Sequence, residues 1–288
     1  MKKLFLIGKS LKHSISPFIH NRILSEFDID AIYSNLELLD TEMLKEFVEM
    51  VRKDEDVVGF NITIPYKEDI LEFCDEVSED VRIIKAANTV KKEDGKLLAY
   101  NTDWIGFKRS LEDRGVDVKD KKILVLGSGG AAKACIYGLY RMGAKEVFVA
   151  NRTYEKAEKL KEVFQDILKI LPVEWLRRYE FKYDIIINTT SVGMFPNIES
   201  SPFDFENYVA GVPVFVYDMI YNPLKTAFLK EAEKKGIKIE NGLKMLVYQA
   251  IEAEMIWFDI VNLSPNFLLE ILNDTEKNFG LGIYKVIG

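Results

Sequence analysis

The sequence predicts a two-domain α/β protein: an N-terminal α/β domain, an inserted domain with a doubly wound parallel sheet, and C-terminal helices that return to the first domain. The chain has 288 residues, of which 48% are hydrophobic, and this is enough for two buried cores. Apolar runs of strand length alternate with amphipathic helical stretches along most of the chain. A glycine-rich turn near the middle joins one such run to a helix. We expect residues 1–103 with 242–288 to form the first domain and residues 104–241 to form the second.

Composition argues against several classes of protein. The net charge is −7 and there is no basic tract, so a nucleic-acid-binding surface is not expected. No apolar run approaches the roughly 20 residues needed to cross a bilayer, and the first residues lack the features of a signal peptide. A membrane partner is therefore not expected. Cys74 and Cys135 lie far apart in helical patterns, which indicates reduced thiols in a cytoplasmic protein. With two histidines and no carboxylate cluster, no metal site is predicted. A homodimer is left open as the assembly.

The elements of the first domain are predicted from apolar runs of strand length and from helical spacing. Ser16-Pro17 suits an N-cap followed by the first residue of a helix. Asp103 suits the N-cap of another helix, unless it serves chemistry instead. In chain order we expect strand Lys3–Ile7, helix Phe18–Phe27, strand Ile32–Leu38, helix Thr41–Val51, strand Val57–Ile64, helix Lys67–Phe73, a hairpin within Ala87–Asn101 that turns at Asp94-Gly95, and helix Ile105–Asp113.

Polar residues interrupt this pattern where a ligand could bind. Ser14 and Ser16 stand at a helix N-terminus, where hydroxyls are available to a carboxylate, although Ser16 could simply be the cap. Asn61 and Thr63 lie in an otherwise apolar strand, and buried amide or hydroxyl groups need partners, which a ligand could supply. Lys67 follows this strand at the end where α/β sheets bind ligands, although a surface lysine is the alternative.

The inserted domain begins with a βαβ unit that predicts dinucleotide binding. Strand Ile123–Leu126, a glycine turn, helix Ala131–Met142 and strand Glu146–Ala150 follow one another within about 30 residues. The turn fits G-x-G-x-x-A: Gly127 permits the tight turn, Gly129 lets the backbone approach a pyrophosphate, and a small Ala132 packs helix on strand. The N–H groups at the helix start would face the phosphates. The unit therefore predicts a Rossmann domain, with a purely structural turn as the alternative.

The end of the second strand of this unit favours NADP(H) over NAD(H). NAD-binding domains usually carry Asp or Glu there, which bonds the ribose 2′-hydroxyl. Here the residues are Asn151-Arg152-Thr153, with Lys156 one turn later. The planar donors of Arg152 match a 2′-phosphate, and no carboxylate repels it. A solvated arginine at a strand end is the alternative interpretation.

The remaining apolar runs complete the predicted sheet and return the chain to the first domain. The polar loop Thr189–Met194 follows one of these runs and is suited to lining a cofactor. The expected elements are strands Tyr183–Asn188, Pro213–Met219 and Lys238–Glu240, and helices Leu224–Lys235 and Leu243–Val261.

Taken together, the motifs resemble those of the shikimate dehydrogenase family over nearly the full length of the chain. They are Ser14–Pro17, Asn61–Lys67, Ala87–Thr89, Asn101–Asp103, Gly127–Ala131, Asn151–Thr153, Asn188–Met194, Tyr217–Pro223 and Gly242 with Gln249. The resemblance implies an NADP-dependent oxidoreductase that reversibly reduces 3-dehydroshikimate to shikimate in aromatic amino-acid biosynthesis.

The resemblance also implies roles at the matching positions. Lys67 and Asp103 would be the catalytic pair, and Ser14 and Ser16 would bind the substrate carboxylate. The substrate ring would be held by Asn61, Thr63, Asn88, Asp103, Tyr221 and Gln249. NADP(H) would be bound by Gly127, Ser128, Gly129, Gly130, Ala131, Asn151, Arg152, Thr153, Lys156, Met219 and Gly242.

Two positions depart from the family pattern. Ser128 stands where alanine is common, and Lys156 stands where a second arginine is common. A lysine provides a point charge instead of a planar fork of donors. We therefore expect the preference for NADP to be weaker but not reversed. The alternatives are an NAD-dependent quinate/shikimate dehydrogenase, a sensor that binds the same ligand without turnover, and an unrelated NADP reductase of similar architecture.

Overall fold

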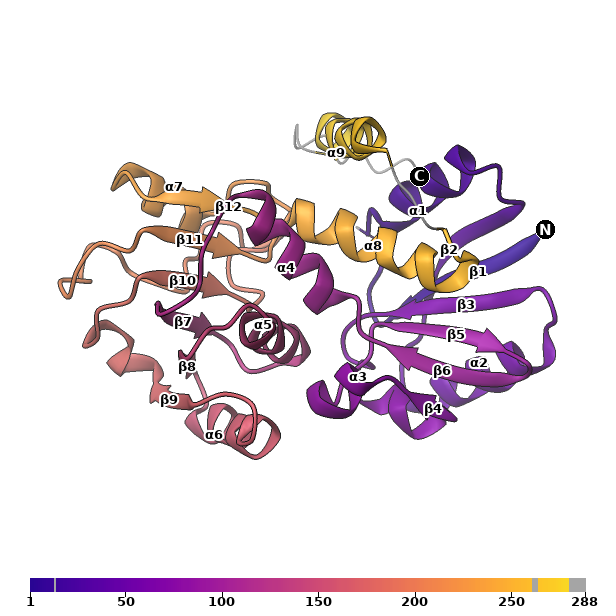
Figure 1. Cartoon of the computed structure of the whole chain (residues 1–288), viewed down its shortest axis with the longest axis horizontal. Helices are drawn as coiled ribbons and strands as arrows, with labels where there is room; N and C mark the ends of the chain where they lie inside the picture. The colour runs from indigo at the N-terminus through magenta and orange to yellow at the C-terminus, as the bar shows by residue number, and fades with distance from the viewer. Residues whose placement is uncertain (13, 261–263, 280–288) are drawn as a thin grey trace. The chain divides into compact units, whose positions relative to one another are not determined.

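The computed structural model of the protein describes residues 1–12, 14–260 and 264–279, which form two units (Figure 1). Unit 1 comprises Met1–Gly106 with Leu246–Phe279, and the described part of unit 2 is Phe107–Met245. The chain passes between the units within helix α4 (Asp103–Asp113) and again within helix α8 (Leu243–Phe258). The boundaries expected from the sequence fall at the N-terminal ends of these two helices.

Unit 1 is built on a six-stranded mixed sheet with the order β2-β1-β3-β5-β6-β4. The first three strands run parallel, β5 is antiparallel to both β3 and β6, and β4 is parallel to β6. One side of the sheet therefore contains the carboxyl ends of β1, β2, β3 and β6 together with the start of β5. The strands are β1 (Lys2–Gly8), β2 (Ala31–Glu37), β3 (Val57–Ile62), β4 (Glu76–Val77), β5 (Thr89–Glu93) and β6 (Lys96–Tyr100).

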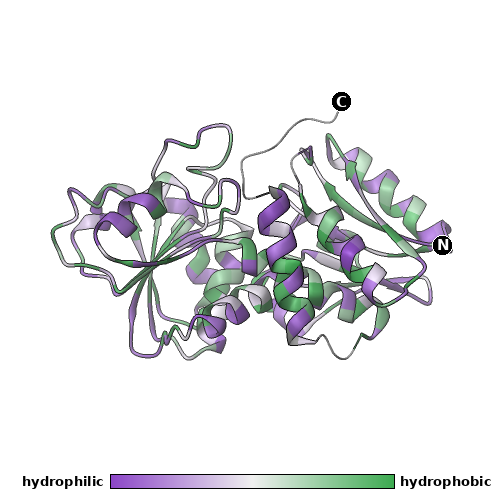
Figure 2. Ribbon diagram, turned by 90° about the horizontal axis from the view of Figure 1, so that it is seen from above, coloured by the Kyte–Doolittle hydropathy of each residue, from purple (hydrophilic) through white to green (hydrophobic). Residues whose placement is uncertain are grey.

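Alternation along β1 sends its side chains into two different cores. Leu4 and Leu6 pack with Trp257 of α8, whereas Ile7 packs with Phe47 on the other face. The helices present amphipathic faces to these cores, and Figure 2 shows hydrophobic and hydrophilic residues on different sides of them. Besides α4 and α8, unit 1 contains α1 (Ser16–Glu26), α2 (Thr41–Lys53), α3 (Glu79–Ile84), α9 (Pro265–Phe279) and a 3₁₀ helix, η1 (Asp69–Phe73).

Unit 2 is built on a parallel sheet with the order β12-β11-β10-β7-β8-β9. The chain winds from β7 outward through β8 to β9, and then from β10 outward on the opposite side. This order confirms the doubly wound Rossmann arrangement, whose ligand crevice lies at the strand carboxyl ends where the order reverses. The strands are β7 (Lys122–Leu126), β8 (Glu146–Asn151), β9 (Ile170–Glu174), β10 (Ile185–Asn188), β11 (Phe215–Asp218) and β12 (Lys238–Glu240), and the helical elements are α5 (Gly130–Arg141), α6 (Tyr154–Phe164), η2 (Trp175–Tyr179) and α7 (Ala227–Lys234).

Several predicted helix limits are wrong. Ser16 is the first residue of α1 and not its N-cap, which is Ile15. Asp103 likewise begins α4 instead of preceding it. The helix expected from Lys67 is only the short 3₁₀ helix η1, because Pro65 and the turn after it delay any regular helix. α7 begins at Ala227, where the Thr226 hydroxyl accepts the N–H of Leu229.

Three other expectations concern the end of α8, the two cysteines and membrane-spanning helices. Helix α8 ends at Phe258, and Val261, where the sequence places its end, is outside the described residues. Cys74 and Cys135 are free thiols in the structure, and the Cys135 side chain is fully buried. None of the helices described here is long and apolar enough to cross a membrane.

Candidate active site

Lys67 and Asp103 meet beyond the carboxyl ends of β3 and β6, at one end of the strands of the unit 1 sheet. The Lys67 Nζ donates to Asp103 Oδ2 over 2.5 Å, and the two side chains are 16% and 10% exposed. Lys67 follows β3 and Asp103 follows β6, so parallel strands bring together residues 36 positions apart. Among the described residues Lys67 has no other hydrogen-bond acceptor, so two of its three N–H groups are available to a ligand.

Asn88 holds the carboxylate from the other side. Its Nδ2 donates to Asp103 Oδ1 over 3.0 Å, to Thr102 Oγ1 over 2.9 Å and to Gln249 Oε1 over 3.3 Å. Its Oδ1 accepts the N–H of Thr102 over 2.7 Å, which orients the amide. Asn88 is 2% exposed and Gln249, on α8, is 7% exposed. The structure therefore brings together four predicted residues, Lys67, Asn88, Asp103 and Gln249.

Asn61 joins this cluster from β3, but its amide is already satisfied within the protein. Its Nδ2 donates to the Asn88 carbonyl over 3.0 Å and to Thr89 Oγ1 over 2.9 Å. Its Oδ1 accepts from the Tyr33 hydroxyl over 2.8 Å. The sequence analysis left the hydrogen-bond partners of Asn61 to a ligand, but the structure shows that they are protein groups. A local sequence pattern could not predict these partners, because they are distant along the chain. Only the second lone pair of Oδ1 remains for a substrate.

The other predicted substrate residues of unit 1 are not hydrogen-bonded to this cluster. Ser14 Oγ accepts the N–H of Ser16 over 3.3 Å at the start of α1, and Ser16 is 7% exposed. Thr63 follows β3, and its side chain makes no hydrogen bond with the described residues. These hydroxyls are available for a carboxylate or hydroxyl. Tyr221 belongs to unit 2, where it follows β11 in a half-buried turn.

The glycine turn of unit 2 lies at the switch point of its sheet, between β7 and β10. Gly127 has φ +111°, and a Cβ there would stand 2.6 Å from Thr189 Oγ1, so only glycine fits. A Cβ at Gly129 would meet nothing within 4 Å. Helix α5 begins at Gly130 with no side-chain cap and no acidic residue in its first turn. Its first N–H groups are therefore available to an anion.

The segment after β8 presents cationic side chains to solvent. Asn151 Nδ2 donates to the carbonyl of Thr153 over 2.8 Å, which holds the turn. Arg152 and Lys156 are exposed, and their side chains make no hydrogen bond or ion pair with any described residue. Both charges can therefore engage an anion without breaking an existing contact. Ser128 is half-buried in the glycine turn, and Ala131 lies in the first turn of α5.

A buried carboxylate organises the loops beyond β10 and β11. Asp218 accepts from Thr226 Oγ1 over 2.6 Å, from Asn188 Nδ2 over 3.0 Å and from the N–H of Ile220 over 3.0 Å. Burial raises the pKa of the Asp218 carboxyl to about 6, although these hydrogen bonds oppose the shift.

This network fixes the backbone at two predicted cofactor residues. Met219 donates its N–H to the Asn188 carbonyl over 3.0 Å, and Gly242 donates to the Ile220 carbonyl over 3.1 Å. A Cβ at Gly242 would lie 2.0 Å from the Met219 carbonyl oxygen, which makes this a second position reserved for glycine.

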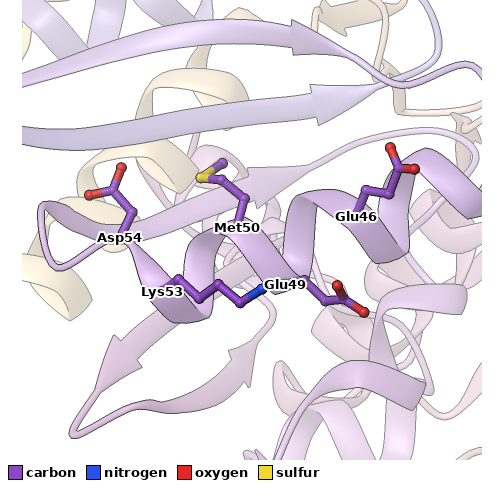
Figure 3. A pocket seen from close by; sticks show the side chains of 5 residues that line it. All are labelled: Glu46, Glu49, Met50, Lys53 and Asp54. Carbon is purple, nitrogen blue, oxygen red and sulfur yellow. The ribbon is translucent and has the colours of Figure 1, made fainter.

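Two surface hollows contain none of these residues. One, of about 450 Å³, lies on the outer side of α2 and is lined by Glu46, Glu49, Met50, Lys53 and Asp54 (Figure 3). The other, of about 590 Å³, lies at the amino ends of β7, β10, β11 and β12, away from the carboxyl ends where such sheets bind ligands. No group of three or more potential metal ligands occurs among the residues that the structure describes.

The cluster includes two residues that the sequence analysis did not assign to the site. Thr89 is fully buried between Asn61 and Asn88, and Thr102 is fully buried between Asn88 and Gln249. Both follow an asparagine in the motifs, and this repeated Asn-Thr pairing was the available signal. Their hydroxyls can accept and donate at once, so they complete hydrogen bonds between amides that could not otherwise be matched.

Two family models match successive parts of the chain. The model of the shikimate dehydrogenase substrate binding domain matches residues 6–90, and the shikimate/quinate 5-dehydrogenase model matches residues 109–197. The shikimate dehydrogenase (NADP(+)) of Caldicellulosiruptor saccharolyticus is 86% identical over 277 residues, which are 96% of this chain and 99% of that protein.

Solved structures show the same similarity. Shikimate 5-dehydrogenase from Thermus thermophilus, in complex with NADP(H) and shikimate, has 32% identity and a TM-score of 0.83, with 95% of this chain and 99% of that chain covered. The Listeria monocytogenes enzyme in complex with shikimate and NAD has 30% identity and a TM-score of 0.84, with 94% and 96% covered. On the sequence match and the full-length structural agreement, this chain belongs to the shikimate dehydrogenase family.

Proposed function

We infer that this protein catalyses the reversible NADPH-dependent reduction of 3-dehydroshikimate to shikimate. The observation that carries the inference is the Lys67–Asp103 contact at the sheet edge of unit 1, held by Asn88 and Gln249. The 86% identical relative named shikimate dehydrogenase (NADP(+)) supports the same substrate and cofactor.

The residues of unit 2 fit NADP(H). The uncapped start of α5 can receive the pyrophosphate, and Gly129, where a Cβ would meet no protein atom within 4 Å, leaves room for close approach of a ligand to the backbone. Arg152 and Lys156 would contact the 2′-phosphate, Arg152 through its planar fork and Lys156 as a point charge. Asn151 and Thr153 would shape that turn, and Met219 would lie against the cofactor.

The side chains of unit 1 would hold the substrate and move one proton. NADP(H), when bound, supplies or accepts the hydride at the substrate carbon. The Lys67 ammonium would donate a proton to the oxygen of the reduced carbonyl, and in the reverse direction the amine would accept it. The same ammonium stabilises negative charge on that oxygen before the proton moves.

Asp103 would have two roles beside Lys67. One oxygen holds the ammonium in place, and the carboxylate can also accept a hydrogen bond from a substrate hydroxyl. Asn88 fixes the orientation of that carboxylate. Ser14 and Ser16 would bind the substrate carboxylate, and Thr63, Asn61, Tyr221 and Gln249 would contact the ring hydroxyls.

The direct test follows the absorbance of the NADPH or NADH formed by the purified protein. Shikimate and quinate are each offered with NADP⁺ and with NAD⁺, which gives four parallel assays. We expect the fastest turnover with shikimate and NADP⁺. Comparable rates with NAD⁺ and quinate would instead identify the NAD-dependent alternative, and absence of shikimate-dependent turnover would leave a sensor that binds without catalysis.

The location and assembly stay predictions. We propose a cytoplasmic protein from its two free thiols, Cys74 and Cys135, because that compartment keeps thiols reduced. Sedimentation of the purified protein distinguishes a monomer from the homodimer left open above.

A further inference from the structure

A buried cluster of aromatic and hydrogen-bonded side chains lies in unit 1 beyond the proposed site. His20 of α1 and Glu254 of α8 are paired over 2.6 Å between Nδ1 and Oε1, and their side chains are 0% and 1% exposed. The His20 ring stacks on Tyr33 with 3.9 Å between centroids and 2° between planes. The Trp257 ring packs against both.

This cluster is not explained by stability alone. His20 Nε2 and Glu254 Oε2 are buried and have no hydrogen-bond partner among the described residues. A buried polar pair with unmatched atoms is often no more stable than well-packed apolar residues of the same volume. The cluster does, however, clamp the Tyr33 ring from one face and so fixes where its hydroxyl points.

The hydroxyl of Tyr33 is directed at the proposed site. It donates to Asn61 Oδ1 over 2.8 Å, and Tyr33 is 2% exposed. Burial, with a smaller effect of the Glu254 charge, raises the pKa of Tyr33 well above its ordinary value, so the phenol keeps its proton. Tyr33 is therefore a permanent donor to Asn61.

The hydrogen bonds beyond Asn61 have a defined direction. Asn61 Nδ2 donates to Thr89 Oγ1 over 2.9 Å, and that hydroxyl is placed to donate to Asn88 Oδ1 over 3.2 Å. Asn88 Nδ2 then donates to Asp103 Oδ1 over 3.0 Å, and Lys67 donates to the other oxygen. One chain of donors thus leads from a phenol to the carboxylate that holds Lys67.

We propose that Tyr33, clamped by His20 and Glu254, is a positioning residue that acts through Asn61 and Asn88 to set the orientation of Asp103 and Lys67. The inference rests on the proposed function, because it concerns the geometry of the same site. Without the Tyr33 hydroxyl, Asn61 Oδ1 is a buried acceptor without a donor. This unsatisfied state costs free energy, which favours rotation of the Asn61 amide toward other donors. Rotation of Asn61 withdraws the donor from Thr89 and loosens Asn88.

The test is Tyr33→Phe, which removes one oxygen and keeps the stacked ring. We expect kcat for shikimate oxidation to fall roughly tenfold, since small misplacements of catalytic groups have effects of this order or larger. The KM for NADP⁺ should stay unchanged. Tyr208→Phe is the matched control, because that buried hydroxyl also makes a hydrogen bond, to the Phe181 carbonyl over 2.9 Å in unit 2. It should leave kcat unchanged.

A double-mutant cycle distinguishes positioning from general destabilisation. If Tyr33 acts through Asn61, then Tyr33→Phe has no further effect on kcat in an Asn61→Ala background. Thr89→Val breaks the same chain one step later, and it replaces the first variant if Tyr33→Phe fails to fold. It should reduce kcat with the KM for NADP⁺ again unchanged.

Three outcomes would overturn the inference: an unaltered kcat in Tyr33→Phe, an equal loss in the Asn61→Ala background, or an equal loss in Tyr208→Phe. Failure of the proposed function is a different result, because the unmodified protein would then show no turnover of shikimate. The wild-type arm of each assay separates the two.

Discussion

Removal of Arg152 should reduce the preference for NADPH over NADH. Arg152 is exposed after β8 and has no partner among the described residues, so Arg152→Ala disrupts no contact within the fold. A hydrogen bond to a charged group contributes about 1.5–3 kcal/mol, equivalent to roughly a 10- to 150-fold change in affinity. Because Arg152 is exposed to solvent and the charge of Lys156 remains, we expect a loss of affinity for NADPH of about tenfold, at the lower end of this range.

The assay compares kcat/KM for NADPH and NADH with 3-dehydroshikimate at low and high salt. The loss should be confined to NADPH, and it should shrink at high salt because exposed charges are screened. Lys161→Ala, an exposed lysine farther along α6, is the matched control and should change neither value. An equal loss with both cofactors, or none with NADPH, would refute the 2′-phosphate role of Arg152.

Three further changes test other parts of the site. Lys67→Ala should lower kcat by about 10² or more with unchanged NADPH binding; near-normal turnover would remove Lys67 from the chemistry. Asp218 has a raised folded-state pKa, so its stabilising effect is greatest below its ordinary value of 3.8 and is lost as the pH rises through about 6. Over that window the loss is about 3 kcal/mol, and urea unfolding of Asp218→Asn should lack it; an identical pH dependence would contradict this. Gly242→Ala places a Cβ against the Met219 backbone and should lower the free energy of unfolding by about 1–3 kcal/mol and raise the KM for NADP⁺, whereas wild-type values would show that the backbone adapts.

Local patterns were sufficient for the Rossmann unit. The strand before Gly127, the helix after it and the strand that ends at Asn151 are each encoded by their own residues and lie in one continuous segment. Helix ends were predicted less well. Ser16 and Asp103 were expected as N-caps because their residue types favour that position, but each is the first residue of its helix.

The candidate site of unit 1 was only partly accessible to sequence reasoning. Lys67 and Asp103 could be placed at strand ends, and motif resemblance suggested their roles. Their contact, and the support from Gln249 across 161 positions to Asn88, depend on how the sheet and α8 pack. Thr102 was quoted in a motif but was not assigned to the cluster. The repeated Asn-Thr pairing was the only signal, because the hydrogen-bond partners of Thr102 are distant in sequence.

By itself the sequence determined the two α/β domains, the glycine turn and the cationic strand end, because each depends on residues that are close along the chain. Only the tertiary structure decided that Asn61 is satisfied by Tyr33, Asn88 and Thr89, and that His20 is paired with Glu254. Hydrogen bonds of this kind join residues up to 234 positions apart, and no local periodicity records which buried polar groups will meet.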